Sequence, residues 1–362
     1  MKRTCLAVAV ALLLVACSQT PEEAAPDLSP QFGTPGTYSA VDQLAVGESG
    51  VYLGGTWKDK PSLIKFSRSG NIPWVRSLSG QVFEVALDSG GSAYVLFHSS
   101  ANDAEYFLRK YTQTGTFVWQ RQFTVPDGDG SGYYASDVDA QNSLYLSYAG
   151  FDASDKKELR KYRSDGTLLY SKPLAEGITD LAVVPDGTTY TVSSKQRLTR
   201  YTSQGAQVWQ KTLPFAASRV AVGSNSQVYV AGQPVFDNYI TENRVLLARY
   251  NSSGAKYWQR TVRTGFFAYG GGLDADTEGN VFVSVNDQES PRDDRDVYFY
   301  SYNAAGTRLV QRTFDFDYDA KLAELGALNA TEVYLGGTDD SSYEEGFLVR
   351  LNGLTGSVTW QR

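Results

Sequence analysis

The chain has 362 residues, of which 42% are hydrophobic and 13% aromatic, so it contains enough apolar material for a large core. Its formal net charge of -7 argues against nucleic acid or an anionic lipid surface as the main partner. His98 is the only histidine, which excludes a histidine cluster that could hold zinc, iron or copper.

The first 16 residues have the pattern of a cleaved export signal. Lys2 and Arg3 precede an apolar stretch from Leu6 to Ala16, and its roughly 11 residues fall short of the roughly 20 that a membrane-spanning helix needs. Leu-Val-Ala-Cys, which ends at Cys17, resembles the lipobox of bacterial lipoproteins, whose cysteine is acylated and becomes the new N-terminus. The resemblance implies lipidation of Cys17 and anchoring in the cell envelope, whereas an ordinary secretory signal is the alternative.

The residues after Cys17 set further expectations. Ser18, in place of aspartate, favours the outer membrane over the inner one in organisms that sort by this position. Residues 17–36 are polar and contain prolines, so they cannot bury enough apolar surface to order themselves. We therefore expect a lipid-anchored flexible tether over 17–36 and one globular domain over 37–362.

A glycine followed four residues later by a large side chain recurs along that domain. The pairs are Gly70/Trp74, Gly115/Trp119, Gly166/Tyr170, Gly205/Trp209, Gly254/Trp258, Gly306/Val310 and Gly356/Trp360. Glycine supplies the positive φ of a hairpin turn, so each pair predicts two strands. An aromatic residue upstream marks a second hairpin in each repeat, and these residues are Tyr52, Tyr94, Tyr145, Tyr190, Tyr229, Phe282 and Tyr334.

Four strands per repeat, at a period of roughly 40 to 50 residues, are typical of propeller blades. The sequence therefore predicts an all-β, seven-bladed β-propeller of four-stranded antiparallel blades. Basic residues on the predicted outermost strands would discourage sheet-to-sheet aggregation; they are Arg76, Arg121, Lys172, Lys211, Arg260, Arg312 and Arg362. We expect the ring to close by packing of blade on blade, or by addition of the segment 31–38 at an edge.

Two segments carry a family resemblance. Residues 273–283 resemble the Asp-x-x-Gly-Asn-x-Tyr-Val pattern of the bacterial seven-bladed β-propeller repeat family, and residues 351–360 are similar to the quinoprotein-type repeat that ends in Thr-Gly-x-x-x-Trp. The resemblance implies the fold, and fold does not fix function. The adjacent cysteine pair typical of quinone-dependent dehydrogenases is absent.

Loops after the second and fourth strands of each blade share one face of the disc, and this face collects acids and aromatics. The candidate binding residues there are Tyr133, Tyr134, Phe236, Tyr239, Phe266, Phe267, Tyr269, Asp315, Asp317 and Asp319. About half of such aromatics are expected to pack beneath their loops instead. Alternating carboxylates also make weak calcium candidates, namely Asp127, Asp129, Asp274, Asp276 and Glu278, although the last three lack the terminal carboxylate of an EF-hand.

Two functions remain open from the sequence. The first is a lipid-anchored, monomeric scaffold that binds envelope proteins, much as the propeller lipoprotein of the outer-membrane barrel-assembly machinery does. The second is a carbohydrate-binding propeller, or a glycosidase or lyase, because paired carboxylates could serve glycoside cleavage. No nucleophile motif or cofactor motif points to an enzyme. We expect a binding role without a cofactor, calcium excepted.

Overall fold

The computed structural model describes residues 39–99, 102–124, 132–149, 156–193, 195–223, 226–235, 243–288, 290, 294–315, 320–339 and 345–362. They form seven four-stranded antiparallel sheets, each built from four consecutive strands. The predicted signal, tether, Cys17 and the segment 31–38 lie outside the described residues. Within them, no helix is long and apolar enough to cross a membrane.

The sheets are the blades of a seven-bladed propeller, as the sequence predicts, and we number them 1 to 7 in chain order. The innermost strands are β1 (Ala40–Gly47), β5 (Val82–Leu87), β9 (Tyr133–Val138), β13 (Asp180–Val183), β17 (Ala216–Gly223), β21 (Tyr269–Ala275) and β25 (Ala320–Asn329). The second strands are β2 (Gly50–Trp57), β6 (Ala93–Ser99), β10 (Leu144–Ala149), β14 (Thr189–Ser193), β18 (Gln227–Gln233), β22 (Val281–Asp287) and β26 (Glu332–Asp339). The third strands are β3 (Lys60–Phe66), β7 (Asn102–Tyr111), β11 (Lys157–Tyr162), β15 (Arg197–Tyr201), β19 (Asn243–Tyr250), β23 (Asp296–Tyr302) and β27 (Gly346–Leu351). The outermost strands are β4 (Trp74–Ser77), β8 (Phe117–Thr124), β12 (Leu168–Pro173), β16 (Gln207–Thr212), β20 (Lys256–Gly265), β24 (Arg308–Phe314) and β28 (Val358–Gln361).

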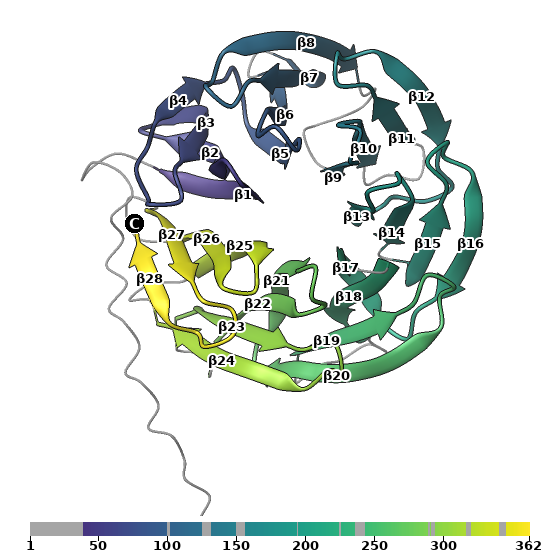
Figure 1. Cartoon of the computed structure of the whole chain (residues 1–362), viewed down its shortest axis with the longest axis vertical. Coiled ribbons are helices and arrows are strands. Elements are labelled where there is room, and N and C mark those ends of the chain that lie inside the picture. The colour runs from purple at the N-terminus through teal and green to yellow at the C-terminus, as the bar shows by residue number, and fades with distance from the viewer. Residues whose placement is uncertain are drawn as a thin grey trace, which may run out of the picture.

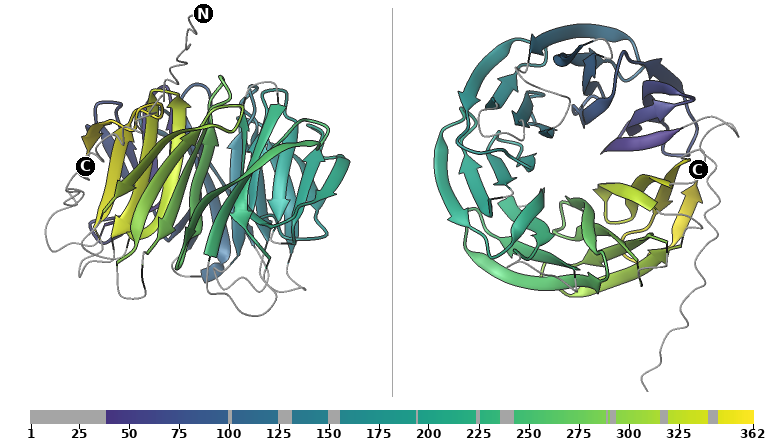
Figure 2. Two further views of the ribbon diagram at one scale, coloured as in Figure 1. Left: turned by 90° about the horizontal axis from the view of Figure 1, so that it is seen from below. Right: turned by 180° about the vertical axis from the view of Figure 1, so that it is seen from behind.

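The blades stand around a central axis, with their first strands at the axis and their fourth strands on the circumference (Figure 1). Seen from the side, the strands run up and down through the disc, so the connections gather on its two faces (Figure 2). Small residues occupy the crowded inner strands, whereas the second and third strands carry most of the buried aromatics. Apolar side chains of both neighbours pack together in each wedge between blades.

Tryptophans of the outermost strands fasten each of five blades to the next one. The indole NH of Trp119 donates to the carbonyl of Ser164 at 3.0 Å, and that carbonyl lies in the hairpin turn between the third and fourth strands of blade 3. The same bond joins Trp74 to Gln113, Trp209 to Ser252, Trp258 to Ala304 and Trp360 to Arg68. We call this contact, together with the basic residue described next, the turn clamp.

The basic residue two positions after the tryptophan completes the clamp, because strand residues i and i+2 point to the same side. Arg121 donates to the carbonyl of Gly166 at 2.7 Å and lies over the ring of Trp119. Arg76, Arg260, Arg312 and Arg362 bond the corresponding glycine carbonyls of the next blades. These residues do lie at the outermost strand, as predicted, but their side chains fold over the neighbouring blade.

The turn glycines have φ between 75° and 82°, in the left-handed region. At Gly166 a side chain would also meet Trp119 and Arg121 at about 2.9 Å. The glycine is therefore required twice, once by the backbone and once by the clamp of the preceding blade.

The ring closes by the same contact. Blade 7 ends the chain, and its Trp360 and Arg362 bond the carbonyls of Arg68 and Gly70 in blade 1 at 3.0 and 3.2 Å. Closure thus follows the predicted packing of blade on blade, and among the described residues every sheet is made only of its own four strands.

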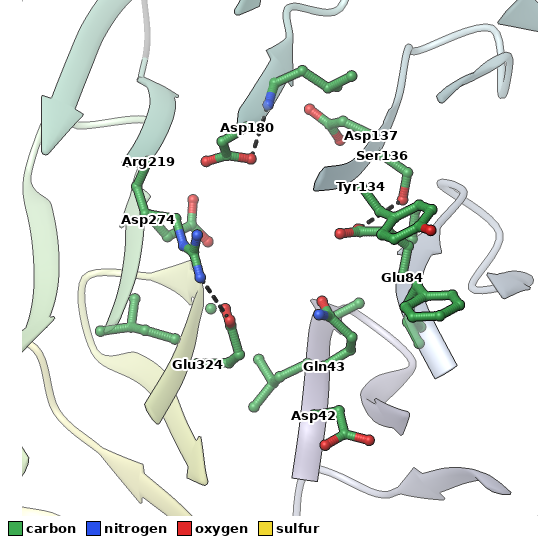
Figure 3. Close-up of a pocket in the computed structure, with 18 of the residues that line it drawn as sticks. Asp42, Gln43, Glu84, Tyr134, Ser136, Asp137, Asp180, Arg219, Asp274 and Glu324 are labelled. Atoms are coloured by element: carbon green, nitrogen blue, oxygen red, sulfur yellow. Dashed lines mark hydrogen bonds and ion pairs between the residues drawn. The ribbon is translucent and has the colours of Figure 1, made fainter. Parts of the chain in front are cut away.

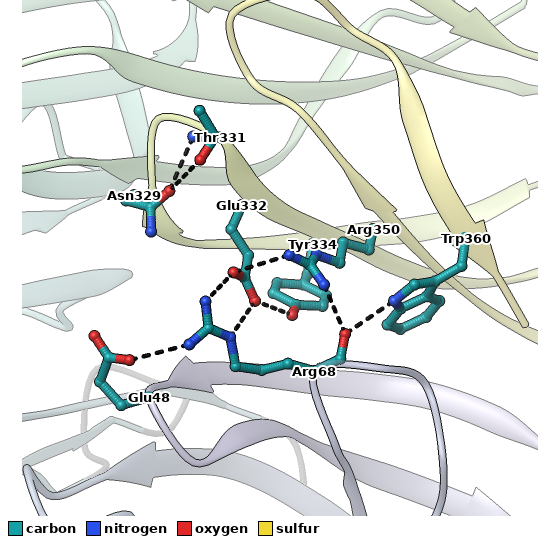
Figure 4. A network of polar contacts seen from close by, with 8 residues as sticks. All are labelled: Glu48, Arg68, Asn329, Thr331, Glu332, Tyr334, Arg350 and Trp360. Carbon is teal, nitrogen blue, oxygen red and sulfur yellow. Dashed lines mark hydrogen bonds and ion pairs between the residues drawn. The ribbon is translucent and has the colours of Figure 1, made fainter.

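A buried carboxylate strengthens this closing interface (Figure 4). Glu332, only 2% exposed, accepts a bond from Arg68 at 2.7 Å and from the hydroxyl of Tyr334, and pairs with Arg350 at 3.0 Å. Burial opposes the charge, but these bonds prevail and lower the pKa of Glu332. Arg350 also donates to the Arg68 carbonyl at 2.8 Å, beside the indole of Trp360.

If closure is one more copy of the clamp, Arg362→Ala and the internal control Arg121→Ala should destabilise the fold alike. Each loses hydrogen bonds to a backbone carbonyl, worth on the order of 1 to 2 kcal/mol. Thermal unfolding followed by circular dichroism measures the effect. An unchanged Arg362→Ala protein beside a destabilised Arg121→Ala protein would show that another contact closes the ring.

Candidate functional site

The axis of the disc contains an acidic cavity of about 790 Å³, lined by the innermost strands (Figure 3). Its charged side chains are Asp42, Glu84, Asp137, Asp180, Arg219, Asp274 and Glu324. Sequence reasoning missed this group, apart from Asp274. The available signal was an acid or arginine inside short strands that otherwise hold small aliphatic residues.

Three of these aspartates bind the neighbouring blade through its backbone. Asp137 accepts the NH of Val183 at 2.6 Å, which joins blade 3 to blade 4. Asp180 accepts the NH of Val220 at 2.8 Å, joining blades 4 and 5. Asp274 accepts the NH of Ala327 at 2.8 Å, joining blades 6 and 7. These carboxylates satisfy backbone donors of inner strands that would otherwise face the cavity.

Arg219 is the cation of this group. It donates to Glu324 at 2.9 Å, so it reaches from blade 5 past blade 6 to blade 7. A side chain at Gly272 of blade 6 would meet the backbone nitrogen of Leu325 at 2.3 Å, which explains why blade 6 places no side chain there. The carboxylate of Glu324 raises the pKa of Arg219 although burial opposes the charge.

Four of the cavity acids have a raised pKa. Burial, aided by the charges of Asp180 and Glu324, raises the pKa of Glu84 to about 8, even though Ser136 donates a hydrogen bond to it at 3.1 Å. Burial likewise raises the pKa of Asp137 and of Asp180 to about 7, and that of Asp274 to about 6. The cavity is therefore a row of coupled acids whose charge changes near neutral pH.

On the face that carries the second-to-third-strand loops, Phe266 and Phe267 form an exposed aromatic pair. They are 37% and 48% exposed, and their rings meet edge to face at 4.8 Å between centroids. The fully buried Asp287 supports them, because it accepts the NH of Phe267 at 3.1 Å and a bond from Arg263 at 2.6 Å. The backbone that carries the pair is thus hydrogen-bonded to a buried carboxylate.

The remaining predicted face residues differ in environment. Tyr134 is packed, since its ring stacks on Phe83 at 4.3 Å and its hydroxyl bonds that of Tyr106 at 2.6 Å. Tyr133 is half-buried at the rim of the axial cavity, and Tyr269 is half-buried at the start of β21. Asp315 is exposed directly after β24. The candidates Phe236, Tyr239, Asp317 and Asp319 lie outside the described residues.

The calcium candidates in blade 6 have partners in the protein itself. Asp276 accepts the backbone NH groups of Glu278 and Asn280 at 2.9 and 2.8 Å, which shapes the hairpin between β21 and β22. Asp274 bonds the next blade instead. Over the described ranges, no three histidines, cysteines or acids converge as metal ligands. Asp127 and Asp129 lie outside those ranges.

Comparison with known proteins gives one family and a common fold. A family model described as "Outer membrane protein assembly factor BamB" matches residues 108–362. No curated protein shows significant sequence similarity to the chain.

Solved structures resemble the chain at low identity. The WD40 repeats of RRP9 are 9% identical with a TM-score of 0.61, covering 89% of this chain and 99% of that one. U3-55K is 9% identical with a TM-score of 0.59, covering 86% and 95%. A Bacteroides caccae protein of unknown function is 11% identical with a TM-score of 0.49, covering 72% and 91%. At such identities the first two show a shared propeller fold alone.

The raised pKa of Glu84 predicts a pH-dependent stability. Because the folded-state pKa of about 8 lies above the ordinary 4.5, the contribution of this group is complete below pH 4.5 and is lost as the pH rises through 8. The melting temperature should therefore fall as the pH rises from 4.5 to about 8, and Glu84→Gln should reduce this fall. Thermal unfolding at a series of pH values tests it, with the exposed Glu278→Gln as control. Equal pH profiles for the Glu84→Gln and parent proteins would refute the coupling.

Proposed function

The chain belongs to the family described as outer membrane protein assembly factor BamB, and from this premise we propose that it is a protein-binding scaffold of the cell envelope. The observation that carries the proposal is the family match over residues 108–362, which runs from the third strand of blade 2 to the end of blade 7. By analogy with the family description, the bound partners would act in the assembly of outer membrane proteins.

The binding surface that we propose is the face with Phe266 and Phe267. Aromatic side chains are enriched at the centres of protein interfaces, and a rigid aromatic pair loses little conformational freedom on binding. The net charge of -7 and exposed acids such as Asp315 favour a partner with a basic rim. The propeller would then present one fixed face to the partner.

Membrane attachment would come from a lipid on Cys17, with residues 17–36 as a tether that lets the disc reach its partner. A single acyl chain binds a membrane only weakly, whereas several chains on one residue hold it firmly. Ser18 favours the outer membrane as the location.

The scaffold proposal predicts that cross-linking of intact cells, followed by affinity capture, yields a reproducible set of envelope proteins. Replacing Phe266 and Phe267 together by serine should remove most of that set, because the aromatic anchors of an interface carry much of its binding energy. The matched control is Val208→Ser, an exposed apolar residue, 49% exposed, on the circumference of blade 4.

Capture of the protein alone would contradict the scaffold role and turn attention to the alternative, a carbohydrate-binding or carbohydrate-active propeller. Equal capture by the parent and the double variant would show that the partners bind another surface of the propeller.

The anchor proposal predicts that Cys17→Ser abolishes incorporation of labelled fatty acid and releases the protein from the membrane fraction. The stable acyl attachment would be gone, while the propeller itself would be unaltered. Ser18→Ala serves as the control and should remain membrane-bound. A Cys17→Ser protein that still sediments with membranes and still carries the label would disprove lipidation at this residue.

A further inference from the structure

A second cavity, of about 280 Å³, opens between blades 3 and 4. Blade 3 contributes the end of its outermost strand and the segment that follows it, and blade 4 contributes residues of β14, β15 and β16. The volume is at the small end of the roughly 300 to 1,000 Å³ usual for ligand pockets. It suits a molecule of about one sugar ring.

This interface differs from the others in composition. The residue that directly follows the recurring aromatic of the second strand occupies an equivalent position in every blade. In six blades this residue is apolar: Leu53, Val95, Leu146, Val230, Val283 and Leu335. Blade 4 has Thr191 there, paired with Thr199 of β15. At the other six interfaces these apolar residues belong to the buried core clusters.

The hydrophobic cluster between blades 3 and 4 is smaller on the blade 4 side, where Thr191 replaces an apolar residue. Its described members from blade 4 are Ile178, Leu181 and Val183, which come from the innermost strand or the segment before it, and it contains none from β14 or β15. Polar side chains therefore stand where the other wedges are filled with hydrocarbon. Such a substitution lowers stability unless the hydroxyls find partners.

One of those hydroxyls has no hydrogen-bond partner among the residues that the structure describes. Ser193 is 2% exposed, lines the cavity, and its oxygen makes no hydrogen bond with any described residue. Thr191 bonds the hydroxyl of Tyr201, and Thr199 accepts a bond from Gln210 at 3.2 Å. Each hydroxyl can both donate and accept, so these groups retain capacity for a ligand.

Two basic residues, Lys172 and Arg197, and one acid, Glu176, line the cavity. Lys172 is exposed to water, and Arg197 already donates a hydrogen bond to the hydroxyl of Thr212. Water screens the charge of Lys172, and Glu176 opposes that of Arg197. The hydroxyls and amides of the lining therefore favour a neutral ligand that offers hydroxyls in return. Apolar surface from Leu174 and Ile178 matches the C–H face of such a ring. We propose that the cleft between blades 3 and 4 binds a neutral polyhydroxylated ligand the size of one sugar ring.

The test is saturation-transfer NMR on the full-length protein in detergent, with glucose, galactose, N-acetylglucosamine and glycerol as separate probes at millimolar concentrations. At least one hexose should bind. Thr191→Val with Ser193→Ala removes two hydroxyls at nearly constant volume, and loss of even one hydrogen bond to the ligand should weaken binding about tenfold. The other blades carry valine or leucine at the first position, so the double variant is expected to fold.

Two controls keep the proposal falsifiable. Thr191→Ser retains the hydroxyl and should retain binding, and Thr261→Val changes an exposed threonine of β20 and should have no effect. Absence of binding by every probe, or equal binding by the double variant, would overturn the proposal. This site is separate from the proposed protein-binding face. The serine variants of Phe266 and Phe267 should therefore bind the hexose normally.

Discussion

The structure depends on the contact by which an outermost strand holds the turn of the following blade. Neighbouring blades share no strand pairing within the described residues, so the seven wedge-shaped interfaces depend mainly on side chains. A tryptophan and a basic residue two positions later satisfy turn carbonyls and cover a glycine that cannot carry a side chain. The last blade makes this contact with the first one, through Trp360 and Arg362.

Because the turn clamps join the blades at the circumference, residues at the axis and on the faces can make other contacts. At the axis, aspartates bind backbone NH groups of the next blade, and Arg219 is the one basic side chain beside the acids among the described cavity residues. On one face, Asp287 holds an exposed aromatic pair. Between blades 3 and 4 the usual apolar filling is replaced by hydroxyls around a cavity. These sites can differ from blade to blade because the turn clamps lie on the circumference of the disc.

The fold was predictable because its signals are local: Gly115 and Trp119, for example, are four residues apart and recur in every repeat with few changes. The partner of Arg121 was not predictable, since the Gly166 carbonyl belongs to the next repeat and is met only once the ring forms. The sequence also did not predict which aromatic side chains are exposed. Both Tyr134 and Phe267 are aromatic residues that the sequence places in loops. In the structure Phe83 and Tyr106 pack against Tyr134, whereas Phe267 remains exposed. The acids at the axis come from separate strands and converge only in the folded disc.

The most direct test of ring closure by the clamp is native-state hydrogen exchange of the second-strand amides in all seven blades. If blade 7 clamps blade 1 as the other blades clamp their successors, the amides of β2 and β26 should exchange as slowly as those of β6, β10, β14, β18 and β22. Selective early exchange of β2 and β26 would show that the interface between the chain ends is the weak one. The ring would then be held shut by something other than the repeated contact.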